Sequence, residues 1–529
     1  MSDGSPLAKD LPRQKSAKPQ SFAATISRNI VASLARVVAV ALVALILPAY
    51  LTHHLPVTTY AAWVLMLQLA AYVSYLDMGI QTAVSKFVAE YDARGDRTGA
   101  SRHASAGLTL MILAAMLGLI LTTLLAFQVP RLFSTMPANL YHDVRVSVML
   151  IGASLSFSLV CAVYSAVFLG LQRYWVPMTI SILNRAFYVA IVVAVVAFHG
   201  NLTAMGMAVA VVNVFTGLAQ VLAWRTKASH IRLSTGLASF SVLKTMARYC
   251  SLQSIWMFGM LCVAGLDVTI VGHYDYIQTA YYSIATLPTT FLLLILGSAM
   301  GPLMPASSAM SIHRSPAEMG DFLARITRYT TALLLLTGLP LIVCGSPLLR
   351  LWVGPAYAAH TLSYLRILVL ANMIRNLCAP YASMICATDK QGAAIATALS
   401  EAVVNLGASV YLASRYGAIG VAIGTLLGSF VSVALHFAIT MRFTRETLSI
   451  PRSRLFLQGL LHPAIIAIPS AALLPLWWSA TRTTLSPHLV ILWAFSTLAA
   501  AWFGAISKQE QNDLLRTFGT RLRTATSHQ

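Results

Sequence analysis

The chain has 529 residues, of which 58% are hydrophobic and only 10% are charged, whereas soluble proteins carry about 25% charged residues. A membrane-spanning helix needs about 20 apolar residues, and runs of that length fill most of the sequence. The composition therefore excludes a soluble protein, and the continuous apolar runs exclude a β-barrel, whose strands alternate. The formal charge of +20 does not indicate a nucleic-acid partner, because the basic residues follow a topological pattern described below.

The sequence begins with a polar, basic segment, residues 1–28, that contains Lys9, Arg13, Lys15 and Lys18. It has neither a compact apolar region nor a small-residue cleavage site, so we expect a retained cytosolic tail rather than a signal peptide. About fourteen transmembrane helices follow, which predicts an all-α integral membrane protein. The predicted spans are 29–51, 58–82, 104–128, 146–170, 177–198, 204–223, 246–272, 278–303, 325–345, 362–385, 393–413, 418–441, 456–479 and 488–507.

The loops between the predicted spans alternate between a basic set and a nearly uncharged set. Basic loops face the cytosol under the positive-inside rule. Their basic residues are Lys86, Arg94, Arg97 and Arg102; Arg225, Lys227, Arg232, Lys244 and Arg248; Arg314, Arg325 and Arg328; and Arg442, Arg445, Arg452 and Arg454. Both termini are then cytosolic, which agrees with an even number of spans. Because no loop is long enough for a folded domain, the function must be performed inside the membrane.

Matching residues recur 217 positions apart, which indicates an internal repeat. Arg173 and Lys390 lie in equivalent basic turns (390 − 173 = 217), and Asn184 and Glu401 lie in the spans that follow (401 − 184 = 217). Halves with an even number of spans are parallel repeats, related by a pseudo-two-fold axis along the membrane normal. We expect two six-helix lobes, a cytosolic linker, an accessory helix pair and a cytosolic tail: 29–223 and 246–441, 224–245, 442–507, and 508–529.

Two lobes of the same topology enclose a cleft, and rocking of such lobes is the usual architecture of a transporter. The charges inside the spans indicate which kind of substrate the cleft binds. Burying a charge at that depth costs free energy, so such a charge usually has a function. Four arginines lie within the apolar runs, which suits an anionic cargo better than a cationic one. These are Arg36, Arg185, Arg366 and Arg375.

Arg375 lies near the middle of the tenth span, within "LANMIRNLCAP", where its side chain is too far from either surface to snorkel easily. Asn372 is three positions earlier and shares its helix face, which Asn376 extends. Two interpretations stay open. Arg375 either meets a pyrophosphate or a sugar in a cavity, or it forms a buried ion pair with an acid such as Glu401.

Arg185 and its neighbour Asn184 lie about eight residues into the fifth span. A guanidinium group binds two phosphate oxygens at once, so both residues are candidates for substrate binding. A salt bridge from Arg185 to Glu401 across the repeat is the structural alternative. Arg36 lies closer to the cytosolic surface, where its side chain either lines the cavity or snorkels to the interface.

Three acids lie within the predicted spans: Asp77, Asp267 and Glu401. A buried carboxylate can carry a proton or bind a cation, and thereby couple transport to an ion gradient. The structural alternative for Asp77 is that it satisfies a helix end beside Gly79, or pairs with a lysine. All three acids are candidates for ion coupling.

Catalytic and cofactor-binding patterns are missing from the sequence. The six cysteines show no CxxC or Cys/His spacing, so we expect no metal site and no disulfide. There is no Walker-type glycine loop, and no loop carries a Ser/His/Asp or paired-carboxylate pattern. The sequence therefore predicts a protein without a cofactor that is not an enzyme.

Three segments carry a resemblance to a known family. From Thr59 the chain reads "TYAAWVLMLQLAAYVSYLDMGIQTAVSKFVAEYDARGD", and "GLDVTIVGHY" and "LLRLWVGPAY" follow later. The first segment resembles the second span and following loop of the Wzx-type oligosaccharide flippases. These form the polysaccharide transport branch of the multidrug/oligosaccharidyl-lipid/polysaccharide (MOP) exporter superfamily. The matching residues are Tyr60, Trp63, Leu76, Asp77, Gly79, Glu90, Tyr91, Gly95 and Asp96, together with Asp267 near the end of the seventh span.

The resemblance implies a MATE-like, V-shaped pair of lobes in the bacterial inner membrane. It also implies flipping of a polyprenyl-pyrophosphate-linked oligosaccharide for exopolysaccharide, capsule or O-antigen synthesis. Alternating access would be driven by a proton or sodium ion, and the partners would be membrane lipid and the polysaccharide polymerase and export machinery.

The alternatives within the superfamily are a lipid II flippase and a multidrug or cation antiporter. The interior arginines and the two extra helices count against the antiporter. A membrane oligosaccharide polymerase is the alternative from another class. Such an enzyme needs a sizeable outer loop, and the longest here are only 129–145 and 346–361.

Overall fold

The computed structural model of the protein describes residues 38–388, 390–478, 487–506 and 510–511. Every regular element in this part of the chain is a helix. Thirteen helices in it are long and apolar enough to cross a membrane, and a shorter apolar helix, Val38–His54, precedes them. The chain is a multi-pass membrane protein, and the predicted all-α architecture is confirmed. The first predicted span begins outside the described residues, where Arg36 also lies.

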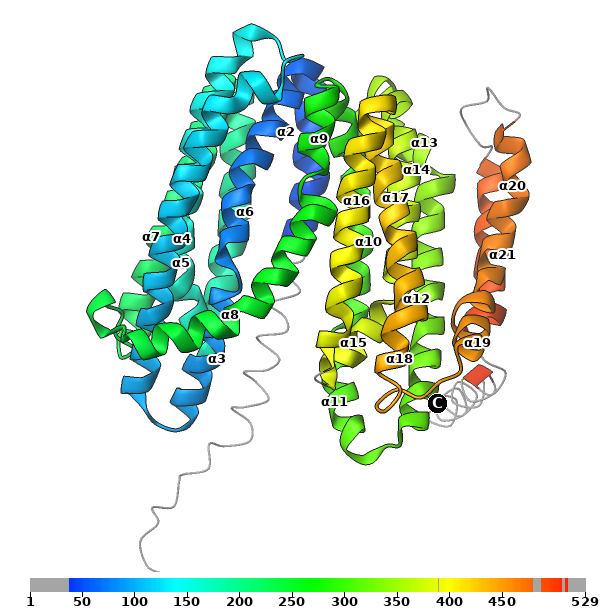
Figure 1. Ribbon diagram of the computed structural model, residues 1–529. Coiled ribbons are helices and arrows are strands. Elements are labelled where there is room, and N and C mark those ends of the chain that lie inside the picture. Colours follow the sequence, from blue (N-terminus) through cyan, green and yellow to red (C-terminus); the bar gives the residue numbers. More distant parts are fainter. Residues whose placement is uncertain (1–37, 389, 479–486, 507–509, 512–529) are drawn as a thin grey trace, which may run out of the picture.

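The N-terminal bundle contains Val38–His54 and the first long helices of the chain, drawn in blue to teal in Figure 1. Helix α2 packs on α5, and α5 also packs along both α4 and α7. After Val38–His54 the elements are α2 (Val57–Ala71), η1 (Tyr72–Asp77), α3 (Ile80–Ala93), α4 (Arg97–Leu132), η2 (Ala138–Leu140), α5 (Tyr141–Gly170), α6 (Trp175–Ala197) and α7 (Leu202–Lys227).

Side-chain caps fix where several helices begin. Asp96 accepts a hydrogen bond from the Gly99 backbone N–H (2.8 Å) and starts α4. Asn201 does the same for the Ala204 N–H (2.9 Å) at the start of α7. Each cap satisfies a backbone donor that the first helical turn leaves free, which stabilises a helix by about 1 kcal/mol. A polar residue at the end of an apolar run therefore sets the helix boundary.

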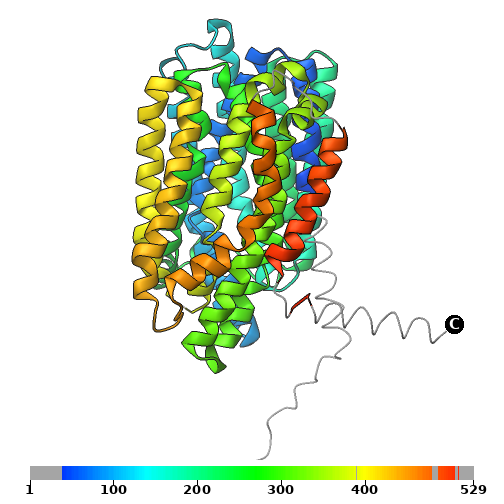
Figure 2. The same ribbon diagram turned by 90° about the vertical axis from the view of Figure 1, so that its right-hand side faces the viewer.

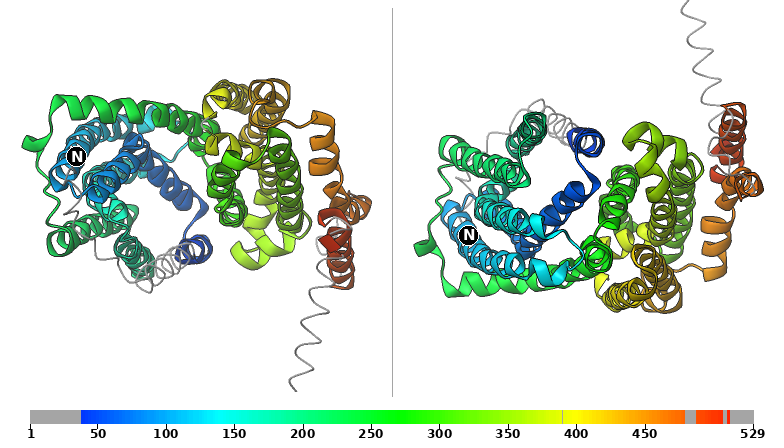
Figure 3. Two further views of the ribbon diagram at one scale, coloured as in Figure 1. Left: turned by 90° about the horizontal axis from the view of Figure 1, so that it is seen from below. Right: turned by 90° about the horizontal axis from the view of Figure 1, so that it is seen from above.

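A bent segment connects the two bundles. It consists of η3 (Thr235–Leu237), α8 (Phe240–Met260), the π-helical turn η4 (Leu261–Gly265) and α9 (Asp267–Tyr274). Figures 1 and 3 show α8 running across the lower part of the N-terminal bundle before the chain turns up into α9. The predicted span 246–272 is therefore not one straight crossing. Met246 and Cys250 are buried against the N-terminal bundle, which holds this end of α8 there.

The C-terminal bundle, green to orange in Figure 1, stands beside the first. Helix α2 of the N-terminal bundle packs against α9 and α10, and one continuous apolar core runs across this contact. The further elements are α10 (Gln278–Met300), α11 (Leu303–His313), α12 (Pro316–Val343), α13 (Gly345–Val353), α14 (Pro355–Asn376), α15 (Ala379–Ala387), η5 (Gln391–Ala394), α16 (Ile395–Tyr416), α17 (Ala418–Leu435), η6 (His436–Thr440) and α18 (Met441–Phe443).

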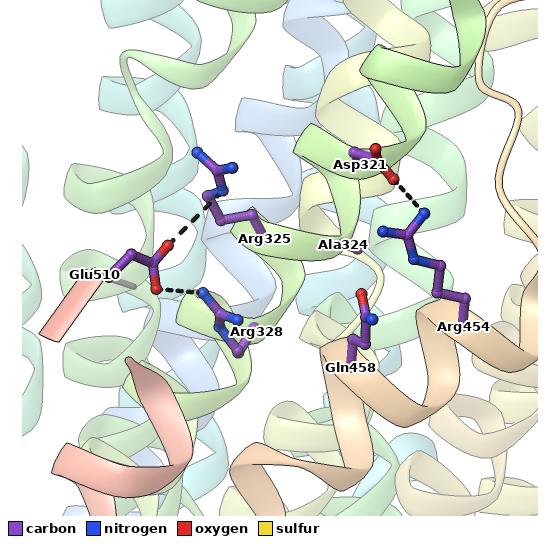
Figure 4. A pocket seen from close by; sticks show the side chains of 7 residues that line it. All are labelled: Asp321, Ala324, Arg325, Arg328, Arg454, Gln458 and Glu510. Carbon is purple, nitrogen blue, oxygen red and sulfur yellow. Dashed lines mark hydrogen bonds and ion pairs between the residues drawn. The ribbon is translucent and has the colours of Figure 1, made fainter. Parts of the chain in front are cut away.

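An accessory pair of helices flanks the C-terminal bundle, as Figures 1 and 2 show. It packs mainly on α12, and its elements are α19 (Arg452–Arg454), η7 (Leu455–Leu461), η8 (Pro463–Ala467), α20 (Ile468–Trp478) and α21 (Pro487–Ala505). A cavity of about 180 Å³ lies at the lower end of the pair. Figure 4 shows the side chains that line it, among which Glu510 pairs with Arg328 (2.6 Å) and Arg454 with Asp321 (2.6 Å). Charged contacts therefore tie the accessory pair to the start of α12.

Candidate functional site

The helix that carries Arg375 is broken within the candidate membrane span Pro355–Ala387. Helix α14 ends at Asn376, and α15 begins at Ala379 with Pro380 in its first turn. Proline is favoured in a first turn because the missing N–H would have no partner there, and disfavoured within a helix. Arg375 therefore lies in the last turn of α14, where the helix dipole favours a positive charge.

The two asparagines beside Arg375 bond to their own helix. The Asn372 amide donates to the Leu368 carbonyl (2.9 Å), and the Asn376 amide donates to the Asn372 carbonyl (2.8 Å). Asn372 is buried. The NH₂ groups of both side chains thus donate to backbone carbonyls near the helix break. Arg375 is therefore the charged residue on this part of α14.

Arg375 forms an ion pair with Glu401 of α16. Its Nε lies 2.5 Å from Glu401 Oε1, and the two side chains are only 18% and 10% exposed. The buried pair, one of the two interpretations of Arg375, is present in the structure, and Glu401 bonds to Arg375 rather than to Arg185. The pair leaves Arg375 Nη2 buried without a hydrogen-bond partner in the described chain, so one arm of the guanidinium group is unused.

A second buried carboxylate lies beside this pair. Asp267, the first residue of α9, accepts hydrogen bonds at Oδ2 from Tyr282 (3.3 Å) and Thr425 (3.2 Å). Its Oδ1 is buried and has no partner among the described residues. Arg375 is close enough to Asp267 to interact with it electrostatically. One guanidinium and two carboxylates therefore meet here, and the cluster carries one net negative charge when all three are ionised.

Oxygen atoms without partners gather in this cluster. Asn405 lies one helical turn after Glu401, is fully buried, and has no hydrogen-bond partner for either amide atom within the described residues. Carboxylate, amide and hydroxyl oxygens are the ligands that hard cations prefer, and a buried carboxylate that lacks a partner otherwise takes up a proton. The arrangement can hold either a proton or a hard cation.

Three members of the cluster were missed by the sequence analysis. Asn405 was detectable, because it lies four positions after Glu401 and so shares its helix face. Tyr282 and Thr425 gave no signal, since a tyrosine and a threonine in apolar helices are ordinary packing residues. Only the approach of α10 and α17 to Asp267 gives them a role.

The cluster adjoins the contact between the two bundles. Gln68 of α2 donates to the Gly265 carbonyl at the end of η4 (2.7 Å), and the Tyr72 hydroxyl bonds to Thr269 of α9. A π-helical turn disturbs the regular helical hydrogen bonds, which frees a carbonyl such as that of Gly265 for a partner. Movement at Asp267 is thereby linked to the packing of α2 on α9.

Arg185 lies on the interior side of α6. The lipid-facing residues of this helix include Leu183 (51% exposed) and Phe187 (60% exposed), whereas Val192 and Val196 are buried. At 100° per residue, Arg185 lies on the buried side with these valines, opposite Leu183 and Phe187. No ion pair or hydrogen bond to Arg185 occurs among the described residues. Its charge therefore faces the bundle without a described counter-ion.

Asn184 and Asp77 make local contacts. The Asn184 amide donates to the Thr216 hydroxyl of α7 (2.6 Å), which connects α6 to α7. Asp77 Oδ1 accepts from the Gln81 N–H (3.2 Å) in the first turn of α3. Asp77 is thus placed at a helix end beside Gly79, away from the cluster around Asp267. Arg36 lies outside the described residues.

The described residues contain no group of three or more His, Cys, Asp or Glu side chains arranged to hold a metal ion. Each described cysteine is a free thiol. The chemistry in the described interior is thus that of buried charges and hydrogen bonds.

Comparison with solved structures identifies the fold. The lipid II flippase MurJ, in an inward closed conformation, matches with a TM-score of 0.68 and 13% identity over 89% of this chain and 98% of that protein. An inward-facing multidrug resistance transporter of the MATE family, in the MOP superfamily, matches with a TM-score of 0.60 and 14% identity over 75% and 96%.

A MOP superfamily transporter from Pyrococcus furiosus, described as having a binding pocket of reverse polarity, matches with a TM-score of 0.53 and 14% identity over 80% and 93%. No protein-family model matches the sequence, and no curated protein sequence matches it either. The chain has the fold of MOP superfamily transporters, and the structures it resembles are flippases and transporters rather than enzymes.

Proposed function

We propose that the protein flips a polyprenyl-pyrophosphate-linked oligosaccharide across the bacterial inner membrane for surface polysaccharide synthesis. The two lobes, residues 29–223 and 246–441, rock against each other so that the interior opens to either side in turn. Both termini are cytosolic, and the polysaccharide polymerase and export machinery use the product. The polyprenyl tail stays in lipid, so only the charged, hydrated head group needs a polar path.

The observation that carries this proposal is the position of Arg185. A guanidinium group on the interior side of α6, without a described counter-ion, attracts an anion and repels a cationic drug. Pyrophosphate is an anion that its fork of donors fits. In the C-terminal bundle, the unused Nη2 of Arg375 offers a second contact, and Asn184, Asn372 and Asn376 lie beside the two arginines.

The accessory helices support a flippase over a multidrug transporter. The match to the lipid II flippase spans 89% of this chain, against 75% for the MATE transporter, and the accessory pair is about the size of this difference. These helices lengthen the apolar flank of the C-terminal bundle, where a long polyprenyl chain can lie in lipid.

The cluster of Asp267, Arg375 and Glu401 is the proposed coupling site. Its net negative charge favours uptake of a proton or a sodium ion, and that uptake removes the attraction that Asp267 exerts on Arg375. Because Asp267 begins α9, which packs on α2, ion binding changes the energy of the contact between the lobes. Asp77, whose carboxylate accepts a hydrogen bond at the start of α3, is a separate candidate for ion coupling.

Complementation tests the proposal. The gene is expressed in a bacterium whose oligosaccharide flippase is deleted, and both the polymer and the lipid-linked repeat unit are measured. We expect polymer export to return and the repeat unit on the inner leaflet to disappear. The proposal would be contradicted if the protein inserted normally into the membrane and the lipid-linked repeat unit still accumulated on the inner leaflet.

The likeness to a lipid II flippase makes that activity the second candidate. Depletion of the host's lipid II flippase distinguishes the two functions. Rescue of growth in that strain, without rescue of polymer export in the first strain, would assign lipid II as the cargo. We expect the reverse result.

A further inference from the structure

A second polar pocket, unrelated to the interior charges, lies at the end of the C-terminal bundle remote from the basic loops. Its volume is about 410 Å³, within the range of roughly 300–1,000 Å³ that small-molecule pockets occupy. It lies where α9 meets α10, beside the start of α14 and the turn between α16 and α17. Its polar lining residues are Asp275, Gln278, His360, Ser363, Tyr364 and Tyr416.

Hydrogen bonds within the lining hold three of its side chains in place. The Tyr364 hydroxyl donates to Gln278 Oε1 (2.9 Å), and the Gln278 N–H donates to Asp275 Oδ1 (3.4 Å). The Gln278 NH₂ group and Asp275 Oδ2 have no partner in the described chain. The pocket thus presents two amide donors and one carboxylate acceptor whose positions are already set before a ligand arrives.

Aromatic rings complete the lining. Tyr416, the last residue of α16, is 65% exposed, and the Tyr281 ring stacks on the His360 imidazole at 4.7 Å between centroids. Gly417, with φ +61°, makes the tight turn that holds Tyr416 beside the pocket. An exposed tyrosine ring offers an apolar face together with a polar hydroxyl, which matches the alternating CH and OH surfaces of a sugar ring.

The charges of the lining exclude an anionic ligand. No lysine or arginine among the described residues lines the pocket, and Asp275 repels phosphate. The other polar side chains of the lining carry amide, hydroxyl and imidazole groups, which form hydrogen bonds. The geometry points to a binding site for a neutral sugar unit. This inference rests on the proposed function, because the sugar would be part of the flipped glycan. The site would hold the glycan on the outer side, apart from its pyrophosphate.

Direct binding to the purified full-length protein tests this inference. The ligands are three neutral trisaccharides (cellotriose, triacetylchitotriose and maltotriose) and the free glycan released by mild acid from the lipid-linked unit that accumulates in the flippase-deleted host. Pyrophosphate is the anionic comparison. Saturation-transfer NMR and calorimetry are carried out on the wild type and on Tyr416→Ala and Gln278→Ala. Tyr411→Ala is the matched control, because Tyr411 is similarly exposed (62%) on the same helix but outside the pocket.

We expect saturable binding of at least one neutral glycan, without competition from pyrophosphate. Tyr416→Ala and Gln278→Ala should each weaken the affinity about tenfold or more, and Tyr411→Ala should leave it unchanged. The inference would be overturned if the wild-type protein bound no neutral glycan. It would also be overturned if Tyr411→Ala lost as much affinity as the pocket variants, or if pyrophosphate displaced the bound glycan. Complementation measured in parallel separates the two proposals. Export without glycan binding refutes only this site, and glycan binding without export refutes only the flippase.

Discussion

At the scale of single residues, the interior charges fall into two groups with different surroundings. Arg185 faces the N-terminal bundle without a described counter-ion, whereas Arg375 is paired with Glu401 at 2.5 Å. From the sequence alone these arginines are equivalent candidates, because a sequence gives the depth of a residue in a span but not its partners. The direction of a helix face and the approach of a second helix decide whether a buried charge is satisfied.

The first residue-scale prediction concerns the order of destabilisation within the cluster. Arg375→Met leaves Asp267 and Glu401 together without a cation, whereas Glu401→Gln leaves Arg375 with Asp267 as a partner. Removing one partner of a buried pair destabilises a protein by about 3–5 kcal/mol. Thermal unfolding in detergent should therefore show a larger fall in Tm for Arg375→Met than for Glu401→Gln, and the opposite order would contradict the described contacts.

The second residue-scale prediction concerns ion coupling. Asp267→Asn keeps the side-chain shape and its hydrogen bonds with Tyr282 and Thr425 but removes the charge. Transport by this variant should no longer respond to pH or to sodium, because the group that takes up the ion is gone. Translocation rates in proteoliposomes over a range of pH and sodium concentration check this, and an unchanged ion dependence would place coupling elsewhere.

At the scale of elements, long apolar runs predicted the helices well, but not their interruptions. The runs around Arg375 and Asp267 contain a helix break after Asn376 and a π-helical turn at Leu261–Gly265. Pro380 signalled the first break, since it is disfavoured within a helix. Nothing in the residues around Gly265 signalled the second, because π-helical turns arise where packing against other helices compensates the irregular backbone.

An element-scale prediction concerns the break between η1 and α3. Gly79 has φ +80°, and a Cβ there would lie 2.4 Å from the Gln253 side chain. Gly95 has φ +72° with open space around it. A left-handed backbone costs a non-glycine residue about 1–2 kcal/mol, so Gly95→Ala should lower stability by that amount alone. Gly79→Ala adds a clash with α8, and its Tm should fall further. Equal Tm values for both variants would show that α8 does not pack on this turn.

At the scale of the whole molecule, two helical bundles share one apolar core near α2, α9 and α10, and an accessory pair flanks one of them. Composition predicted a bundle of many apolar helices, as found, and the loop charges predict the direction in which these helices cross the membrane. The position of α8 did not, because Met246 and Cys250 look like the start of a span and become buried only against a bundle that is distant in sequence. The contact of the accessory pair with α12 is likewise non-local.

A whole-molecule prediction concerns that contact. Glu510 pairs with Arg328, whose side chain is 14% exposed, and accepts a hydrogen bond from the Tyr329 hydroxyl (2.6 Å). Hydrogen bonds to charged groups contribute about 1.5–3 kcal/mol, so Glu510→Gln should lower the Tm measurably. Glu446→Gln is the control, because Glu446 is 88% exposed and 4.0 Å from Lys390. A Tm for Glu510→Gln equal to that of the control would show that the contact does not stabilise the protein.

The central claim is that an interior guanidinium group receives the anionic head group of a lipid-linked oligosaccharide. Its most direct test is translocation in proteoliposomes, measured by the exposure of the labelled glycan to a membrane-impermeant oxidant. The wild type and Arg131→Ala, a change of an exposed arginine in the last turn of α4, should translocate at equal rates. Arg185→Ala should be slower by about tenfold or more. Equal rates for Arg185→Ala and the wild type would contradict the claim.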